Sequence, residues 1–261
     1  MHDIPRLLAF ADTLADAARV AILPYFRAPH RVENKRSDIF DPVTDADRAS
    51  ETAMRALIER EFPEHSILGE EFGGELATRG YQWILDPIDG TRAFVAGLPT
   101  WGVLIGLYHD GAPLIGVMDQ PYLDERYRGF PGGANATIRG ATRALNTRAC
   151  AAMSDAILST TDPTLFRGEE VAAFERARDG AKVMRYGFDC YAYCMVASGT
   201  MDCVIESGLK VFDIAALIPI LAGAGGGVCA WDGGSAAKGS RVLAYGDARV
   251  RDEALALLAP R

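Results

Sequence analysis

The chain has few features of a secreted, zinc-binding or disulfide-stabilised protein. Its cysteines are odd in number and none belongs to a CxxC pair (Cys150, Cys190, Cys194, Cys203, Cys229). This usage excludes a disulfide framework and a zinc site, and it predicts free thiols in a reducing compartment. Asp3, Arg6 and Asp12 interrupt the apolar pattern of the N-terminus, which is not typical of a signal peptide. We therefore expect a cytoplasmic protein.

The chain also lacks a long apolar run that is free of helix breakers. Residues 214–231 carry no charge and reach the lower length limit for a membrane span. Pro219, Gly223 and three consecutive glycines at 225–227 interrupt the run. A buried helix, a glycine turn and a short strand explain it better. We predict no membrane partner.

Basic clusters are missing as well. The net charge is −8, which argues against nucleic-acid binding through a positive face. The sequence has neither the G-x-S-x-G elbow of serine hydrolases nor the G-x-x-x-x-G-K-[ST] loop of nucleotide triphosphatases. The four histidines are too scattered for metal-ligand spacing (His2, His30, His65, His109). An acidic protein that acts on an anionic substrate needs a cation between the like charges, so these absences favour a metal-dependent enzyme.

The hydrophobic pattern predicts an α/β fold in two halves. With 261 residues, 49% of them hydrophobic, the chain can form one large domain or two closely packed halves. In residues 1–145, helical spacing over 4–26 and a helix that starts at Asp45 or Asp47 precede antiparallel strands (81–85, 103–108, 113–118, 125–130, 136–139). Residues 146–261 alternate strands and helices, including a helix over 213–224, which is typical of α/β layering. We expect one integrated unit with its site between the halves.

The most informative stretch is Asp86-Pro87-Ile88-Asp89-Gly90-Thr91, which follows an apolar run over 81–85. Two carboxylates flank a turn that proline stiffens, and a glycine and a hydroxyl follow. Carboxylate and carbonyl oxygens suit Mg²⁺. A backbone that passes through a glycine into a helix start can point N–H groups at an anion. The stretch therefore predicts a site for a divalent cation and a phosphate.

Four acids, Glu70, Asp86, Asp89 and Asp213, stand at predicted strand ends or helix starts. In a layered α/β fold such ends collect on one rim, where ligands bind. Carboxylates that meet there repel one another unless cations lie between them. Each acid also has an ordinary interpretation: Glu70 as a solvated loop residue, and Asp89 and Asp213 as helix caps. Capping does not exclude metal binding.

Three segments match the inositol monophosphatase family in order and spacing. They are Gly69-Glu70-Glu71, the stretch over residues 83–91, and Phe212-Asp213-Ile214-Ala215-Ala216. The resemblance covers residues 7–257. It implies a layered α-β-α-β-α sandwich of the inositol monophosphatase/fructose-1,6-bisphosphatase type, and a homodimer.

The resemblance also implies a role for each site residue. A first Mg²⁺ would bind Glu70, Asp86 and the Ile88 carbonyl, and a second would bind Asp86, Asp89 and Asp213. The family implies two or three ions per site, and Mn²⁺ can replace Mg²⁺ because oxygen ligands accept both.

The catalytic set implied by the resemblance is Asp47, Glu70 and Thr91. Asp47 and Thr91 would orient a metal-activated water for attack on phosphorus, while Gly90 and Thr91 would offer N–H groups to the phosphate. The expected partner is a small phosphorylated metabolite.

Within the family, the chain resembles the histidinol-phosphate phosphatase branch over residues 92–102, 145–148, 160–163, 187–193 and 208–210. Arg92 and Ala96 stand where inositol phosphatases usually carry Asn and His. The expected reaction is hydrolysis of L-histidinol phosphate to L-histidinol and phosphate, a step of histidine biosynthesis. The alternatives are an inositol-1-monophosphatase, a 3′(2′),5′-bisphosphate nucleotidase, and a metal-binding scaffold protein without activity.

Asp189 and Glu206 align near the family's substrate pocket, where two acids would favour a cationic substrate. Alternatively, Asp189 caps its helix and Glu206 bonds a hydroxyl. Arg185 either steadies the phosphate or lies exposed at a strand end, and Tyr191 and Tyr193 either stack on an imidazole or pack in the core. The full predicted substrate-binding set is Ile88, Asp89, Gly90, Thr91, Arg185, Gly187, Asp189, Glu206 and Asp213.

Overall fold

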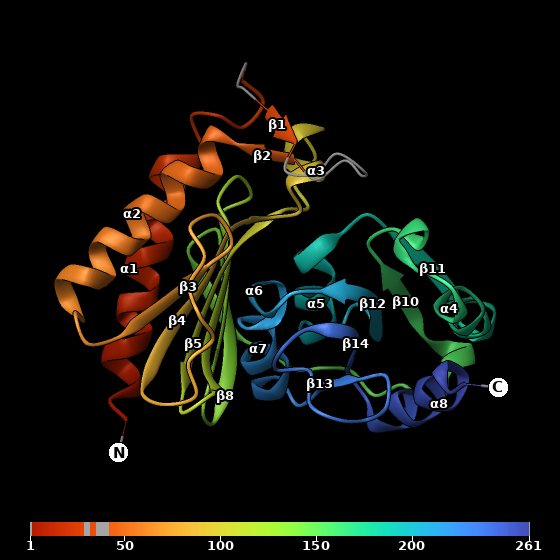
Figure 1. The fold of residues 1–261 in the computed structure, drawn as a ribbon. Helices are drawn as coiled ribbons and strands as arrows, with labels where there is room; N and C mark the ends of the chain where they lie inside the picture. Colours follow the sequence, from red (N-terminus) through yellow and green to blue (C-terminus); the bar gives the residue numbers. More distant parts are fainter. Residues whose placement is uncertain (1, 29–31, 35–41, 261) are drawn as a thin grey trace.

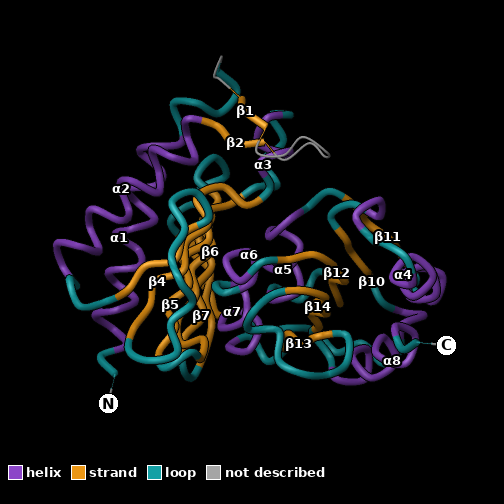
Figure 2. The backbone as a smooth tube through the Cα atoms, viewed as in Figure 1, coloured by secondary structure: helices purple, strands orange, loops and turns teal. Residues whose placement is uncertain are grey.

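Two β-sheets alternate with three layers of helices in the computed structural model, which describes residues 2–28, 32–34 and 42–260 (Figure 1). Helices α1 and α2 cover one face of a seven-stranded sheet, and α5, α6 and α7 lie between it and a five-stranded sheet. Helices α4 and α8 cover the far side of the smaller sheet. Figure 2 shows the same order of layers. The predicted α-β-α-β-α sandwich is confirmed.

The outer helices follow from two amphipathic segments. Helix α1 (Ile4–Ile22) buries the predicted apolar stripe, including Leu7, Leu14 and Ile22. It ends before the predicted Phe26, since Pro24 has no N–H to continue the helical hydrogen bonds. Helix α2 (Asp45–Glu61) starts where expected, and its N-cap is Thr44. Asp47 accepts the Thr44 N–H at 2.8 Å and completes a capping box.

The large sheet has the strand order β3-β4-β5-β6-β7-β8-β9. Strand β3 pairs parallel with β4, and all later neighbours are antiparallel. A tight turn at Asp110 and Gly111 joins β5 to β6, the strands predicted over 103–108 and 113–118. The strands are β3 (Ser66–Gly69), β4 (Tyr81–Asp89), β5 (Gly102–His109), β6 (Ala112–Gln120), β7 (Glu125–Phe130), β8 (Gly133–Ile138) and β9 (Ala141–Ala144). A separate pair consists of β1 (Val32–Asn34) and β2 (Pro42–Thr44), and α3 (Thr91–Val95) follows β4.

The small sheet has the order β11-β10-β12-β14-β13, with strands β10 (Ile157–Thr160), β11 (Val183–Tyr186), β12 (Cys203–Leu209), β13 (Gly227–Ala230) and β14 (Ser240–Tyr245). Its helices are α4 (Glu169–Gly180), α5 (Asp189–Ala197), α6 (Val211–Ile214), α7 (Leu217–Gly223) and α8 (Ala248–Leu258), with short 3₁₀ turns at Met153–Asp155 and Pro163–Leu165. The single helix predicted over 213–224 is therefore two helices. Pro219 has no N–H for the carbonyl of Ala215, so an unbroken helix cannot form.

A row of glycines lets the middle helices lie directly on the large sheet. Gly106, Gly116 and Gly129 stand opposite one another on β5, β6 and β7. A Cβ on Gly116 would come within 1.9 Å of the Ala216 carbonyl oxygen, and one on Gly129 within 2.2 Å of the Ile220 nitrogen. The row thus fixes the position of α6, and with it Asp213, relative to the sheet.

The structure also tests several smaller predictions. The five cysteines are buried and unpaired. Among the described residues, no helix has both the length and the apolar character needed to cross a bilayer. His30 and residues 35–41 lie outside the described residues. We propose that the halves divide at residue 145, because every strand of the large sheet precedes this point and every strand of the small sheet follows it.

Replacing Gly116 by alanine should destabilise the protein by about 2–3 kcal/mol, because the new methyl meets backbone that cannot move aside as a side chain could. Urea unfolding measures the loss. Gly133→Ala is the matched control on β8, since its Cβ would lie 3.6 Å from the Phe130 ring, an ordinary contact. Equal stability of the two variants would contradict the close approach of helix and sheet.

Candidate metal centre

Strand β4 is longer than predicted and delivers two carboxylates through an irregularity. Its pairing with β5 shifts register between Asp86 and Asp89, a β-bulge. Pro87 lies in this bulge, where no ladder hydrogen bond requires its missing N–H. The Ile88 N–H turns back and donates to Asp86 Oδ1 at 3.1 Å. The bulge therefore aims Asp86 and Asp89 at one place.

Four acids from three parts of the chain meet at this place. Carboxylate oxygens of Asp86, Asp89 and Asp213 lie within 4.8 Å of one another. Glu70 follows β3, its N–H donates to the Leu85 carbonyl at 3.1 Å, and its side chain contacts the Asp86 carboxyl. The cluster predicted from the sequence is thus assembled.

Asp89 and Asp213 also accept backbone N–H groups at the starts of helices, although neither is itself an N-cap residue. Asp213 accepts the Lys210 N–H at 2.6 Å, as a residue in the first turn of α6 does. Asp89 does not cap α3, whose N-cap is Gly90 at φ +82°. It accepts the Cys190 N–H at 2.7 Å, so it links the large sheet to the start of α5.

The electrostatics of the cluster favour a cation. Burial raises the pKa of Asp86 well above its usual value, and the charges of Glu70, Asp89 and Asp213 raise it further. Burial also raises the pKa of Asp89, with added repulsion from Asp189 and Asp213. Oxygen donors at this spacing fit Mg²⁺ or Mn²⁺, which would offset the repulsion.

Asp47 and Thr91, the predicted water-orienting pair, make their hydrogen bonds to other groups. Asp47 Oδ2 accepts from the backbone and hydroxyl of Thr44, while Oδ1 is buried and has no hydrogen-bond partner among the described residues. Burial raises the pKa of Asp47 to about 7, against the effect of the Thr44 hydrogen bonds and with the charges of Glu71 and Glu70 adding to it. The Thr91 hydroxyl donates to the Ile88 carbonyl at 3.0 Å. Asp47 thus retains one acceptor atom for a further donor.

A small cavity of about 20 Å³ adjoins the cluster, and four of its eight lining residues are acids. This volume suits one water molecule or one ammonium group. Burial raises the pKa of Glu206 to about 7, although Glu206 accepts hydrogen bonds from Thr161 and Thr160. Burial raises the pKa of Asp189 to about 6, which the charge of Arg92 opposes. The lining residues are Asp89, Thr161, Asp189, Cys190, Tyr193, Glu206, Leu209 and Asp213.

The other predicted substrate residues lie outside this lining. Arg185 is exposed on β11 with its guanidinium over the Phe188 ring, and Gly187 donates its N–H to the Thr161 carbonyl. The Tyr191 hydroxyl donates to Glu125, and neither residue lines this cavity. Tyr193 does line the cavity, and its buried hydroxyl has no hydrogen-bond partner among the described residues. No spacing in the sequence distinguishes these two tyrosines.

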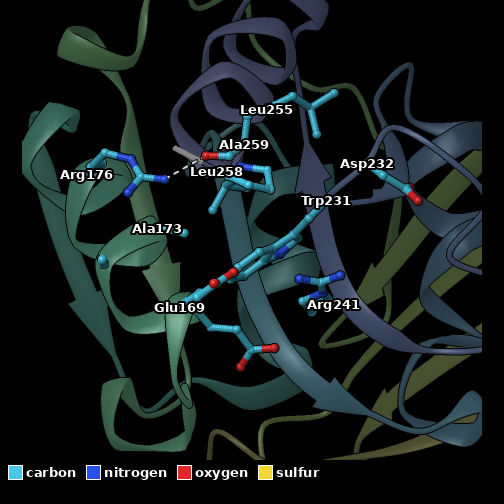
Figure 3. Close-up of a pocket in the computed structure, with 12 residues that line it drawn as sticks. Glu169, Ala173, Arg176, Trp231, Asp232, Arg241, Leu255, Leu258 and Ala259 are labelled. Carbon is cyan, nitrogen blue, oxygen red and sulfur yellow. Dashed lines mark hydrogen bonds between the residues drawn. The ribbon is translucent and has the colours of Figure 1, made fainter.

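A larger cavity, of about 430 Å³, lies between α4, α8 and the end of β13 (Figure 3). Its charged groups serve structural contacts. Arg176 donates to the carbonyls of Leu257 and Ala259, and Arg241 lies over the Trp231 ring. The Arg176 bonds join α4 to α8 and the residue that follows it, and we assign this cavity no catalytic role.

Comparison with known proteins agrees with this geometry. A sequence model of the Inositol monophosphatase family matches residues 3–260. The chain belongs to the inositol monophosphatase family. It is 41% identical over 264 residues to "Bifunctional phosphatase IMPL2, chloroplastic" of Arabidopsis thaliana, an alignment that covers 97% of this chain and 75% of that protein.

Two further relatives carry different names. The chain is 36% identical over 260 residues to "Histidinol-phosphatase" of Mycobacterium tuberculosis, covering 98% of this chain and 97% of that protein. The structure of an inositol monophosphatase from Zymomonas mobilis superposes with a TM-score of 0.86 and 37% identity, covering 99% of both chains. Membership of the family makes the chain a phosphatase, and the acidic cluster is its candidate metal site.

The cluster predicts how divalent cations and pH affect stability together. Because the folded state raises the pKa of Asp47, Asp86 and Asp89, it binds more protons than the unfolded state between about pH 4 and about pH 7. The metal-free protein should therefore lose stability as pH rises through this window. Mg²⁺ binds the deprotonated acids, so its stabilising effect should grow with pH and reach about 2.7 kcal/mol at 100-fold excess over its Kd.

Thermal unfolding with and without Mg²⁺, at about pH 5 and about pH 8, measures this effect. Asp86→Asn is the control, since it removes one buried carboxylate and should flatten both the pH dependence and the response to Mg²⁺. A wild-type response to Mg²⁺ that is equal at both pH values would contradict a cation site built from these acids.

Proposed function

We propose that the chain is a Mg²⁺-dependent phosphomonoesterase that hydrolyses L-histidinol phosphate to L-histidinol and phosphate, a step of histidine biosynthesis. The observation that carries the proposal is a pair of acids, the half-buried Asp189 and the buried Glu206, in the cavity beside the metal cluster. The name of the Mycobacterium tuberculosis relative supports the same substrate. Localisation in the cytoplasm and a homodimeric state stay predictions.

The cluster residues would hold the cations. Glu70, Asp86 and the Ile88 carbonyl would bind one, and Asp86, Asp89 and Asp213 another. When bound, the cations neutralise charge on the phosphate and lower the pKa of the attacking water. The N–H groups of Gly90 and Thr91 would orient the phosphate at the start of α3.

Asp47 would act on the water. Its unbonded Oδ1 can accept a proton, and a pKa of about 7 suits a general base near neutral pH. Thr91 bonds the Ile88 carbonyl and so fixes the orientation of that proposed ligand. Asp47 would take the proton as the water attacks, and Thr91 would hold the geometry.

The leaving alcohol would be recognised by charge. L-Histidinol carries an ammonium and an imidazole that can protonate, whereas inositol offers only neutral hydroxyls. A cavity of about 20 Å³ with two non-cluster acids suits an ammonium, because each carboxylate can accept a charge-assisted hydrogen bond. The cationic group would also offset the cost of burying Glu206 fully and Asp189 partly.

Inositol 1-phosphate is the second candidate substrate, because the similar structure from Zymomonas mobilis is called an inositol monophosphatase. Glu206 could accept a hydrogen bond from an inositol hydroxyl as well as from an ammonium. The bisphosphate nucleotidase and scaffold alternatives have no comparable support, and the next experiment tests them all.

Phosphate release should be measured side by side on L-histidinol phosphate, inositol 1-phosphate and adenosine 3′,5′-bisphosphate with saturating Mg²⁺. We expect kcat/KM to be highest for L-histidinol phosphate by at least about 100-fold, the discrimination expected when a charged partner is missing from a buried site. Asp86→Asn controls for contaminating phosphatases and should lose most activity while it remains folded. A preference for either other substrate, or near-normal turnover by Asp86→Asn, would end this assignment.

Glu206→Gln tests the charge recognition. The change keeps size but removes the negative charge, so KM for L-histidinol phosphate should rise about tenfold, the worth of one hydrogen bond to a charged group. KM for inositol 1-phosphate should change much less. The readout is the ratio of the two changes in KM. An equal rise in KM for both substrates would show that Glu206 does not discriminate between them by charge.

A further inference from the structure

Glu51 is a fully buried acid that the metal cluster does not include. It lies one helical turn after Asp47 and is one of the buried residues of α2, the helix that packs against β4 of the large sheet. Figure 1 shows α2 beside this sheet. Its carboxylate accepts the N–H groups of Glu71 at 2.8 Å and Phe72 at 3.2 Å, and Arg55 Nε at 2.7 Å. Arg55 balances the charge of Glu51, and the two backbone hydrogen bonds attach Glu51 to the loop that carries Glu70.

The loop is closed on itself at the same point. Gly69 and Gly73 exchange backbone hydrogen bonds of 3.1 and 3.0 Å, and Arg55 Nη2 donates to the Gly73 carbonyl at 2.6 Å. Glu51 and Arg55 together therefore fasten both sides of the turn to α2. Gly69 makes this possible, because a Cβ there would lie 1.9 Å from Glu51 Oε1.

The peptide that Glu51 holds belongs to Glu70. The N–H of Glu71 is in the same peptide plane as the Glu70 carbonyl, and the Glu70 N–H is bonded to the Leu85 carbonyl, next to Asp86. Both flanking peptides of Glu70 are thus held in place. Only the side-chain torsions of Glu70 are left to adjust when it meets a cation.

We propose that Glu51 is a positioning residue that sets the affinity of the metal centre by fixing the backbone of Glu70, with Arg55 as its partner. The inference rests on the proposed metal centre and deepens it. Residues that orient a metal ligand commonly change affinity by about 10–100-fold when they are replaced. A purely structural role would instead lower stability without changing cation binding.

Mn²⁺ binding to the metal-free full chain, measured by isothermal titration calorimetry, separates these roles. Glu51→Gln keeps the shape but leaves one acceptor oxygen for two backbone N–H groups and the Arg55 guanidinium, so Kd for Mn²⁺ should rise about tenfold. In steady-state assays the Mg²⁺ concentration for half-maximal rate should rise similarly, while kcat at saturating Mg²⁺ is largely restored.

Asp202→Asn is the matched control. Asp202 is a buried carboxylate that also accepts a backbone N–H, from Ile157 at 2.7 Å, and an arginine, Arg148, but it lies in the small sheet. It should lower the unfolding temperature as Glu51→Gln does, yet change Kd for Mn²⁺ less than about twofold, as expected for a distant site.

Arg55→Lys is a milder variant that decides the question if Glu51→Gln does not fold. It keeps the charge but loses part of the clamp, and should raise Kd about threefold, the worth of one ordinary hydrogen bond. Wild-type affinity in a folded Glu51→Gln or Arg55→Lys protein would overturn the proposal, and so would a wild-type chain that binds no Mn²⁺. A wild type that binds Mn²⁺ but hydrolyses none of the three phosphate esters would reject the proposed function alone, and the Kd ratios would still test Glu51.

Discussion

Mutual repulsion among closely spaced carboxylates is the constraint on which the rest of this structure depends. Asp86, Asp89 and Asp213 bring oxygens within 4.8 Å of one another, and Glu70 joins them; Asp86 is buried and the other three are half-buried. Such an arrangement costs free energy unless the acids hold protons or a cation. A fold that maintains it must fix each acid through its backbone. The surrounding contacts do this.

Several separate backbone features hold the four acids in place. The bulge in β4 aims Asp86 and Asp89, and the Cys190 N–H ties Asp89 to the opposite half. The glycine row seats α6 so that Asp213 reaches the cluster. The turn after β3, fastened to α2, holds Glu70. The cluster is therefore a product of the whole layered fold rather than of one loop.

Much of this could be predicted from the sequence, for identifiable reasons. The helical stripe of α1, the strands over 103–108 and 113–118 and the α/β alternation after residue 146 are local patterns, and local patterns persist in the fold. The four acids were found because a short motif and strand ends restrict where they can lie. Substrate contacts were less accessible: Arg185 stacks on Phe188, and only three-dimensional packing places Tyr193, rather than Tyr191, in the cavity.

What the sequence could not reveal depends on partners distant in the chain. Strand β4 was predicted to end at residue 85, since the bulge exists only through pairing with β5. The break at Ala215 was missed although Pro219 signals it, because apolar residues continue on both sides. Nothing in the sequence indicated this role for Glu51. Its pairing with Arg55 is the common i,i+4 ion pair of a helix, and its other partners are backbone N–H groups 20 and 21 residues away, which every residue type except proline has.

The packing of α7 on the glycine row also has a consequence for folding during synthesis. The second face of the large sheet, with Leu104, Met118 and Tyr127, is covered by Leu217, Ile220 and Leu221 of α7. A ribosome synthesises all seven strands before it reaches these residues. The apolar face that α7 covers in the structure therefore lacks this cover until α7 has been synthesised, and during that time it is open to association with chaperones or other chains.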